Sequence, residues 1–253
     1  RDVETAFLER ALGIISKNLD REVKKGLVPE AEKPKILRRI QTTTKLDSFS
    51  GADFVVEAVP ERLEVKLEVL QEVDKVLRPE VILASNTSSI SVTGLAGGTS
   101  RPDRFLGMHF MNPVPVMALV EVIRALQTSE ATFATTMALC EKLGKKPVAV
   151  NDAPGFVSNR VLMPMINEAA YCVMEGVAPA EAVDAVMKLG MNHPMGPLEL
   201  ADLIGLDVCA DIMEVLYEGF ADSKYRPCPL LRKMVSAGWL GRKAGRGFYA
   251  YTT

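Results

Sequence analysis

The order of strand-like and helix-like segments is the feature that most constrains how this chain folds. Five short apolar segments have strand character; they are residues 52–60, 79–84, 105–110, 117–123 and 147–151. Helical spacing of apolar residues marks segments between them, such as 61–77 and 130–143. This alternation predicts an α/β fold with a mostly parallel sheet and helices on both of its faces.

The strand pattern ends at residues 151–155, Asn-Asp-Ala-Pro-Gly. Beyond this break the sequence predicts only helices, at residues 156–175, 180–189, 198–220 and 229–237. The first of them carries a wide apolar face, which suits a helical bundle. We therefore predict two domains, an α/β domain over residues 1–151 and an all-α domain over residues 152–253.

The N-terminal region is helical and basic. Residues 2–19 have the spacing of a helix, and residues 20–39 are rich in Lys and Arg. One interpretation of the basic stretch is a solvated helical hairpin, because charge runs usually face water. The other is a binding surface for a polyphosphate, and the pattern alone leaves both open.

Composition excludes several classes of protein. The formal net charge of the 253 residues is −2, so we expect neither a nucleic-acid partner nor a membrane partner. Four cysteines lie far apart, without the spacing of a metal site, so no metal is expected. Reduced cysteines favour a reducing compartment, namely the cytoplasm or, as the alternative, the mitochondrial matrix.

A histidine and a glutamate stand out in two neighbouring strand segments. His109 lies near the end of the segment 105–110, which Asn112 and Pro113 interrupt, and ligands of open α/β sheets bind at the carboxyl ends of strands. Glu121 is the only charge in the segment 117–123 and needs a partner if it is buried. Paired with Glu121, His109 would act as a general base. The alternative is a core histidine and a glutamate that ends a strand.

A polar turn follows the segment 79–84. Residues 85–89, Ser-Asn-Thr-Ser-Ser, would present hydroxyls and amides to a ligand at a strand's carboxyl end. An ordinary loop of turn-forming residues is the alternative.

Seven motifs follow one another along the chain: VVEA (55–58), SNTSS (85–89), GMHFMNPVPVM (107–117), LVEVI (119–123), DAPGFVSNR (152–160), PMGP (194–197) and GRKAGRGFY (241–249). With these motifs the chain resembles the 3-hydroxyacyl-CoA dehydrogenase family, including the 3-hydroxybutyryl-CoA dehydrogenases. The resemblance implies a Rossmann-like domain followed by a helical domain for substrate binding and dimerisation. It also implies NAD-dependent interconversion of 3-hydroxyacyl-CoA and 3-oxoacyl-CoA, as in β-oxidation of fatty acids.

The resemblance implies roles for individual residues of this sequence. His109 corresponds to the general base and Glu121 to the residue that orients it. Ser88 corresponds to the contact with the substrate hydroxyl beside the nicotinamide, and Asn159 to the residue that closes over the substrate oxygen. Hydride transfer with loss of one hydroxyl proton needs little more than one base and fixed donors.

Further residues correspond to binding positions of the family. Those implied to contact NAD are Asp2, Ala58, Glu61, Lys66, Asn86, Ser88 and Asn112. Without the family, Asn112 is equally a turn former before Pro113, and Glu61 and Lys66 would be a solvated first helical turn. Lys24 and Lys25 resemble the projection that grips the CoA tail, in the least similar part of the chain. Wide apolar helix faces in the second domain suggest a homodimer.

The sequence departs from the family at its start. The family begins with a strand and a glycine-rich turn that seats the pyrophosphate, and the sequence has no such turn. We expect a Rossmann-like domain that is incomplete at its N-terminus, with unpaired strands and exposed apolar surface, as part of a longer protein. If the protein is this short, its NAD binding should be badly weakened.

Two other functions compete with the dehydrogenase. The missing turn favours a catalytically silent relative that binds acyl-CoA or serves as a structural dimerising module. A related 3-hydroxyacid dehydrogenase acting without CoA would use a lysine base in the first helix of the second domain. Residues 156–175 contain no lysine.

Overall fold

The structure, a computed structural model, describes residues 1–251; residues 252 and 253, at the end of the predicted second domain, lie outside the described residues. The chain forms two compact units. The first comprises Arg1–Thr87 and Val92–Ala149, and the second comprises Ser88–Ser91 and the chain from Val150 onward. The sequence did not predict that Ser88–Ser91 would group with the second unit.

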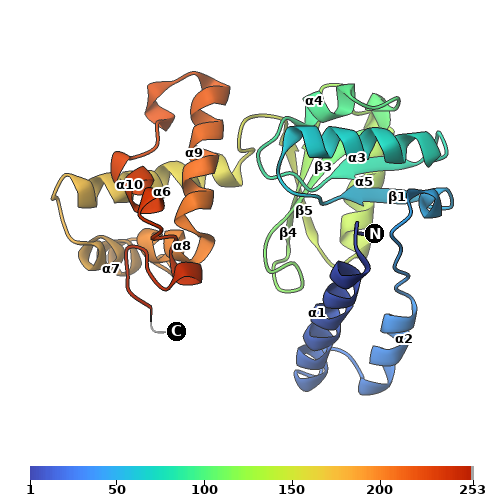
Figure 1. Ribbon diagram of the computed structural model, residues 1–253, viewed down its shortest axis with the longest axis horizontal. Helices are drawn as coiled ribbons and strands as arrows, with labels where there is room; N and C mark the ends of the chain where they lie inside the picture. The colour runs from blue at the N-terminus through green and yellow to red at the C-terminus, as the bar shows by residue number, and fades with distance from the viewer. Residues whose placement is uncertain (252–253) are drawn as a thin grey trace. The chain divides into compact units, whose positions relative to one another are not determined.

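A five-stranded sheet organises the first unit (Figure 1). Its strands, in spatial as in chain order, are β1 (Phe54–Glu57), β2 (Ile82–Ser85), β3 (Phe105–Phe110), β4 (Leu119–Arg124) and β5 (Lys146–Asn151). β1, β2 and β3 run parallel, whereas β3 and β4 are antiparallel. The antiparallel pair follows from the short link between them, residues 111–118, because a parallel crossover needs a dozen or more residues. The predicted mostly parallel sheet is confirmed.

The first unit also contains helices. They are α1 (Thr5–Lys24), α2 (Lys33–Arg38), α3 (Leu63–Val76), α4 (Val92–Gly97) and α5 (Glu130–Lys142), with short 3₁₀ turns η1 (Glu30–Glu32), η2 (Leu46–Phe49) and η3 (Pro102–Arg104). Of these helices, α3, α4 and α5 contact the sheet. The prediction that the first helix ends at residue 19 is wrong, because α1 continues to Lys24. The basic stretch therefore lies on the end of α1 and on α2, which pack side by side as a hairpin (Figure 1).

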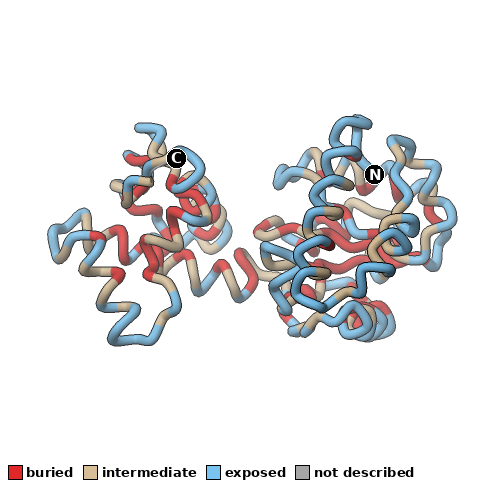
Figure 2. Tube along the Cα trace, turned by 90° about the horizontal axis from the view of Figure 1, so that it is seen from below, coloured by how far each residue is buried: buried red, intermediate tan, exposed pale blue. Residues whose placement is uncertain are grey.

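The two faces of the sheet are covered differently. Phe133 of α5 packs against Leu106, Met108 and Val122, which occupy alternate positions on one face. On the other face Gly107 allows a close approach, since a Cβ there would lie 2.9 Å from the Val92 side chain of α4. Figure 2 shows the buried residues running along these strands.

The second unit is helical. It contains α6 (Ser158–Met174), α7 (Ala180–Gly190), α8 (Pro197–Ile204), α9 (Leu206–Phe220), η4 (Ser223–Tyr225), α10 (Pro229–Ser236) and η5 (Arg242–Ala244). Its core includes Met163, Leu198 and Leu216. The prediction of one helix over residues 198–220 is wrong, because Gly205, with φ +109°, separates α8 from α9.

Two buried aspartates hold the C-terminal motif of the second unit. The Asp202 carboxylate accepts hydrogen bonds from the backbone N–H groups of Phe248 and Tyr249 and from the Tyr251 hydroxyl. Asp184 accepts a hydrogen bond from the Tyr249 hydroxyl at 2.7 Å. Burial, followed by the hydrogen bond to Asp202, raises the pKa of Tyr251 to about 12. The motif GRKAGRGFY thus has a packing role in this unit.

Candidate functional site

His109 and Glu121 face each other across the antiparallel pair. The register aligns His109 of β3 with Glu121 of β4, and His109 Nδ1 lies 2.8 Å from Glu121 Oε2. Both side chains lie on the face of Gly107, because positions two apart on a strand share a face. Their residues are 9% and 3% exposed, so the contact is shielded from solvent and short. The predicted contact between these two side chains is therefore present.

A carboxylate at this distance selects one tautomer of the imidazole. The Nδ1–H of His109 donates to Glu121, which leaves Nε2 as the nitrogen that can accept a proton. A buried carboxylate also stabilises the imidazolium that forms when Nε2 takes a proton. The pair therefore has the chemistry of an oriented general base.

Polar groups gather at the carboxyl ends of β1 and β2. Asn86, directly after β2, accepts a hydrogen bond through Oδ1 from the backbone N–H of Phe110, next to His109. Lys66 of α3 forms an ion pair with Glu61 at 3.2 Å. The solvated-turn interpretation is wrong for Lys66, whose residue is completely buried, whereas the Glu61 side chain is 34% exposed. Lys66 is buried because Glu57, which sequence reasoning missed, neutralises it.

Ser88 and Asn159 meet within the second unit. Asn159, in the first turn of α6, donates from Nδ2 to the backbone carbonyl of Ser88 at 2.9 Å. Gly155, with φ +72°, precedes this helix, and a Cβ there would lie 2.7 Å from Leu216. The segment of Ser88 is also held by Ser91, whose hydroxyl donates to Asp152 at 2.9 Å.

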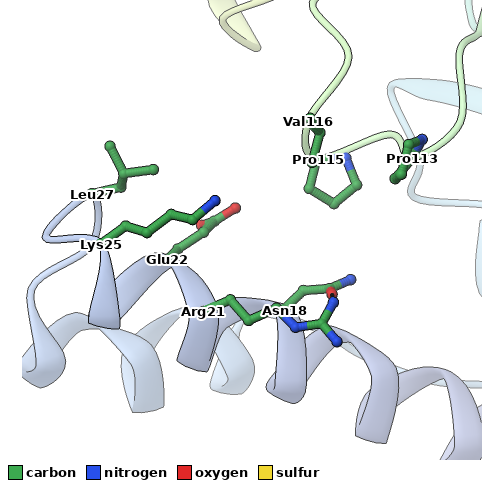
Figure 3. A pocket seen from close by; sticks show the side chains of 8 residues that line it. All are labelled: Asn18, Arg21, Glu22, Lys25, Leu27, Pro113, Pro115 and Val116. Carbon is green, nitrogen blue, oxygen red and sulfur yellow. Dashed lines mark hydrogen bonds between the residues drawn. The ribbon is translucent and has the colours of Figure 1, made fainter. Parts of the chain in front are cut away.

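A pocket of about 330 Å³ lies between the end of α1 and the loop after β3 (Figure 3). Its lining residues are Asn18, Arg21, Glu22, Lys25, Leu27, Pro113, Pro115 and Val116. Of the two lysines expected to bind substrate, Lys25 lines the pocket and Lys24 does not. Lys145 supports the loop by donating to the carbonyls of Val114 and Met117. The basic run indicated this region, but only the fold brings Arg21 and Lys25 opposite the prolines.

The remaining expected cofactor residues are accessible to solvent. Asp2, Ala58 and Asn112 are all exposed. Asp2 accepts from the backbone N–H of Val3, and its own N–H donates to the carbonyl of Thr43. Asn112 is joined to Pro113 by a cis peptide bond.

Neither a metal cluster nor a membrane helix occurs in the part of the chain that the structure describes. Over residues 1–251, no group of three or more His, Cys, Asp or Glu side chains is arranged to hold a metal ion. Within the same range, no helix has the length and apolar character to cross a membrane.

Comparison with known proteins covers both units. Residues 1–153 match the family described as "3-hydroxyacyl-CoA dehydrogenase, NAD binding domain", and residues 155–251 match "3-hydroxyacyl-CoA dehydrogenase, C-terminal domain". A Bacillus subtilis protein named "Probable 3-hydroxybutyryl-CoA dehydrogenase" is 59% identical over 99% of this chain and 87% of its own length. The 3-hydroxybutyryl-CoA dehydrogenase of Bradyrhizobium diazoefficiens is 56% identical over 99% of this chain and 85% of its own length.

A solved structure is similar over the same extent. The crystal structure of (S)-3-hydroxybutyryl-CoA dehydrogenase PaaH1 from Ralstonia eutropha has a TM-score of 0.97 and 53% identity. The match covers 100% of this chain and 89% of that chain. With both family domains matched in order along its length, the chain belongs to the 3-hydroxyacyl-CoA dehydrogenase family and carries its NAD-binding domain.

Proposed function

We propose that the protein interconverts 3-hydroxyacyl-CoA and 3-oxoacyl-CoA with NAD, and that 3-hydroxybutyryl-CoA is its substrate. The observation that carries this proposal is the buried contact of 2.8 Å between His109 Nδ1 and Glu121 Oε2. The substrate follows from the names of the relatives from Bacillus subtilis and Bradyrhizobium diazoefficiens.

His109 moves the proton in this proposal. Its Nε2 accepts the proton of the substrate's 3-hydroxyl, and Glu121 stabilises the resulting imidazolium. Bound NAD supplies the hydride acceptor. In the reverse direction, the same imidazolium returns the proton to the oxygen of the 3-oxo group. One residue therefore serves both directions.

Ser88 and Asn159 are assigned to the substrate oxygen. The Asn159 amide is already oriented, because its Nδ2 donates to the Ser88 carbonyl and its residue is 7% exposed. Fixed donors near a reacting oxygen stabilise the charge that develops on it without reorganisation.

The residues at the ends of β1 and β2 fit the nicotinamide end of NAD. Glu61 and Asn86 supply a carboxylate and an amide, groups that can hydrogen-bond a carboxamide, and the Lys66 ammonium pairs with Glu61. Because Lys66 is buried behind Glu61, we assign the direct contact to Glu61 and a supporting role to Lys66. Ala58, Asn112 and Ser88 are proposed as further contacts and Asp2 as the ribose ligand, where an acid favours NAD over NADP.

The pocket at the end of α1 is proposed to hold the CoA tail. Arg21 and Lys25 offer positive charge for phosphates, and Pro113, Pro115 and Val116 offer an apolar wall. Lys24, outside this lining, is proposed to contribute only to the surrounding positive field.

The test is oxidation of NADH by the purified protein with acetoacetyl-CoA, which is measured as the loss of NADH absorbance. We expect turnover with acetoacetyl-CoA and none with free acetoacetate, because the free acid lacks the CoA tail. A chain that binds acetoacetyl-CoA but never oxidises NADH would refute the proposal and favour an acyl-CoA-binding module.

We further propose a homodimer, located in the cytoplasm. Large apolar side chains of the second unit, including Val186, Leu189 and Met191, are more than 60% exposed, and a second copy would cover such a surface. Sedimentation that shows only monomer at micromolar concentration would contradict the dimer. The bacterial sources of the relatives support the cytoplasm.

A further inference from the structure

A chain of polar contacts links the ends of the first two strands. Glu57 and Ser85, the last residues of β1 and β2, are paired in the sheet register. The Ser85 hydroxyl donates to Glu57 Oε2 at 2.5 Å, and the backbone N–H of Val59 donates to Oε1 at 2.6 Å. Glu57 therefore fixes both the end of β2 and the turn that follows β1.

Lys66 extends this chain toward solvent. Its ammonium, which α3 carries, donates to Glu57 Oε1 at 2.9 Å and to the Val59 carbonyl at 3.1 Å. The same ammonium lies 3.2 Å from Glu61, which also accepts a hydrogen bond from the Thr87 hydroxyl at 2.6 Å. The contacts thus run from a buried carboxylate through a buried ammonium to Glu61.

The carboxylates of Glu57 and Glu61 differ in their exposure to solvent. The side chains of Glu57 and Lys66 are each 1% exposed, whereas that of Glu61 is 34% exposed. Only Glu61 of these three charged groups is substantially open to a ligand. A buried ammonium is strongly disfavoured without a charged partner, so Glu57 is what allows Lys66 to stand behind Glu61.

We propose that Glu57 is a positioning residue for cofactor binding, which acts by holding Lys66 and, through it, the Glu61 carboxylate. The inference rests on the proposed function, in which Glu61 contacts the nicotinamide end of NAD. Glu57 itself touches neither cofactor nor substrate in this scheme.

The same helix provides a matched control. Asp74, near the other end of α3, forms an ion pair with Arg101, and the two side chains are 9% and 7% exposed. Arg101 also donates to the carbonyls of Leu77 and Val81, at the amino end of β2 rather than its carboxyl end. Loss of this ion pair removes a buried charge interaction of the same kind without touching Glu61.

The test compares Glu57→Gln with Asp74→Asn by fluorescence titration of NADH, well below the melting temperature of each variant. Both variants are expected to melt at lower temperature than the wild type. For Glu57→Gln we expect the NADH dissociation constant to rise about tenfold, and for Asp74→Asn to stay within about twofold. The KM for NADH should rise in Glu57→Gln while the KM for acetoacetyl-CoA is unchanged.

Wild-type affinity in Glu57→Gln, or an equal loss in Asp74→Asn, would overturn the proposal. If Glu57→Gln fails to fold, Glu57→Asp decides, because it keeps the buried charge but shortens the side chain that holds Lys66. An increase of about threefold in the NADH dissociation constant supports the proposal, and an unchanged constant overturns it. A wild-type protein that binds no NADH would instead refute the proposed function and this inference with it.

Discussion

Replacement of Glu121 by Gln separates the charge of this residue from its shape. Gln has the same size, and its Oε1 can still accept a hydrogen bond from His109 Nδ1. In the wild type this contact, to Glu121 Oε2, spans 2.8 Å. The fold and the imidazole orientation should therefore survive. What is lost is the negative charge opposite the imidazolium that forms during proton transfer.

The size of the effect follows from Coulomb's law. Two unit charges roughly 4 Å apart interact by about 4 kcal/mol at an effective dielectric constant of about 20. With half to all of the proton's charge on the ring in the transition state, the barrier rises by about 2–4 kcal/mol, on the order of 30- to 1,000-fold in kcat.

Initial rates of NAD reduction with 3-hydroxybutyryl-CoA, the direction in which the imidazolium forms, measure this loss, and NADH fluorescence titration verifies that cofactor affinity is retained. The matched control is Glu130→Gln, since Glu130 is 87% exposed in its ion pair with Arg124 and should leave the rate unchanged. If Glu121→Gln keeps a rate within about threefold of the wild type, the charge of Glu121 does not assist the base.

Three further predictions concern the pocket, acid stability and the C-terminal motif. Arg21→Ala and Lys25→Ala should each raise the KM for acetoacetyl-CoA about three- to tenfold, less so at high salt, with NADH affinity unchanged in titrations. Burial raises the pKa of Asp74, but hydrogen bonds from Ser100 and Arg101 outweigh burial and hold that pKa below its ordinary value. Its contribution to stability is thus present above about pH 4 and lost as pH falls through the folded pKa, so urea unfolding of Asp74→Asn should depend less on pH in acid. Gly247→Ala would place a Cβ 1.9 Å from Asp202 and should lower the free energy of unfolding by about 2 kcal/mol or more in the same assay.

The contact between His109 and Glu121 could be proposed from the sequence because each residue carries a local signal. Each residue is a polar interruption of an apolar strand segment, and a buried carboxylate needs a partner. Their exact pairing came only with the antiparallel register of β3 and β4, which depends on the short link between them. The sequence alone had left a core histidine equally open.

Other features were not predicted, because they depend on tertiary contacts or because the apolar pattern hid them. Lys66 lies in an unremarkable amphipathic helix, and only its partner Glu57, nine residues earlier at the end of β1, explains its burial. The break at Gly205 was hidden because apolar spacing continues through it, although a glycine inside a helical pattern weakens that prediction. The carboxylate of Asp202 meets the motif that begins at Gly241 only after the helices have packed.

The most direct test of the central claim is the turnover of His109→Gln with acetoacetyl-CoA and NADH. If His109 transfers the proton, as the acid in this direction and the base in the other, kcat should fall by a factor on the order of 100 to 10,000, while the NADH dissociation constant stays within about twofold. An unchanged kcat at unchanged NADH affinity would contradict the claim and remove His109 from the reaction.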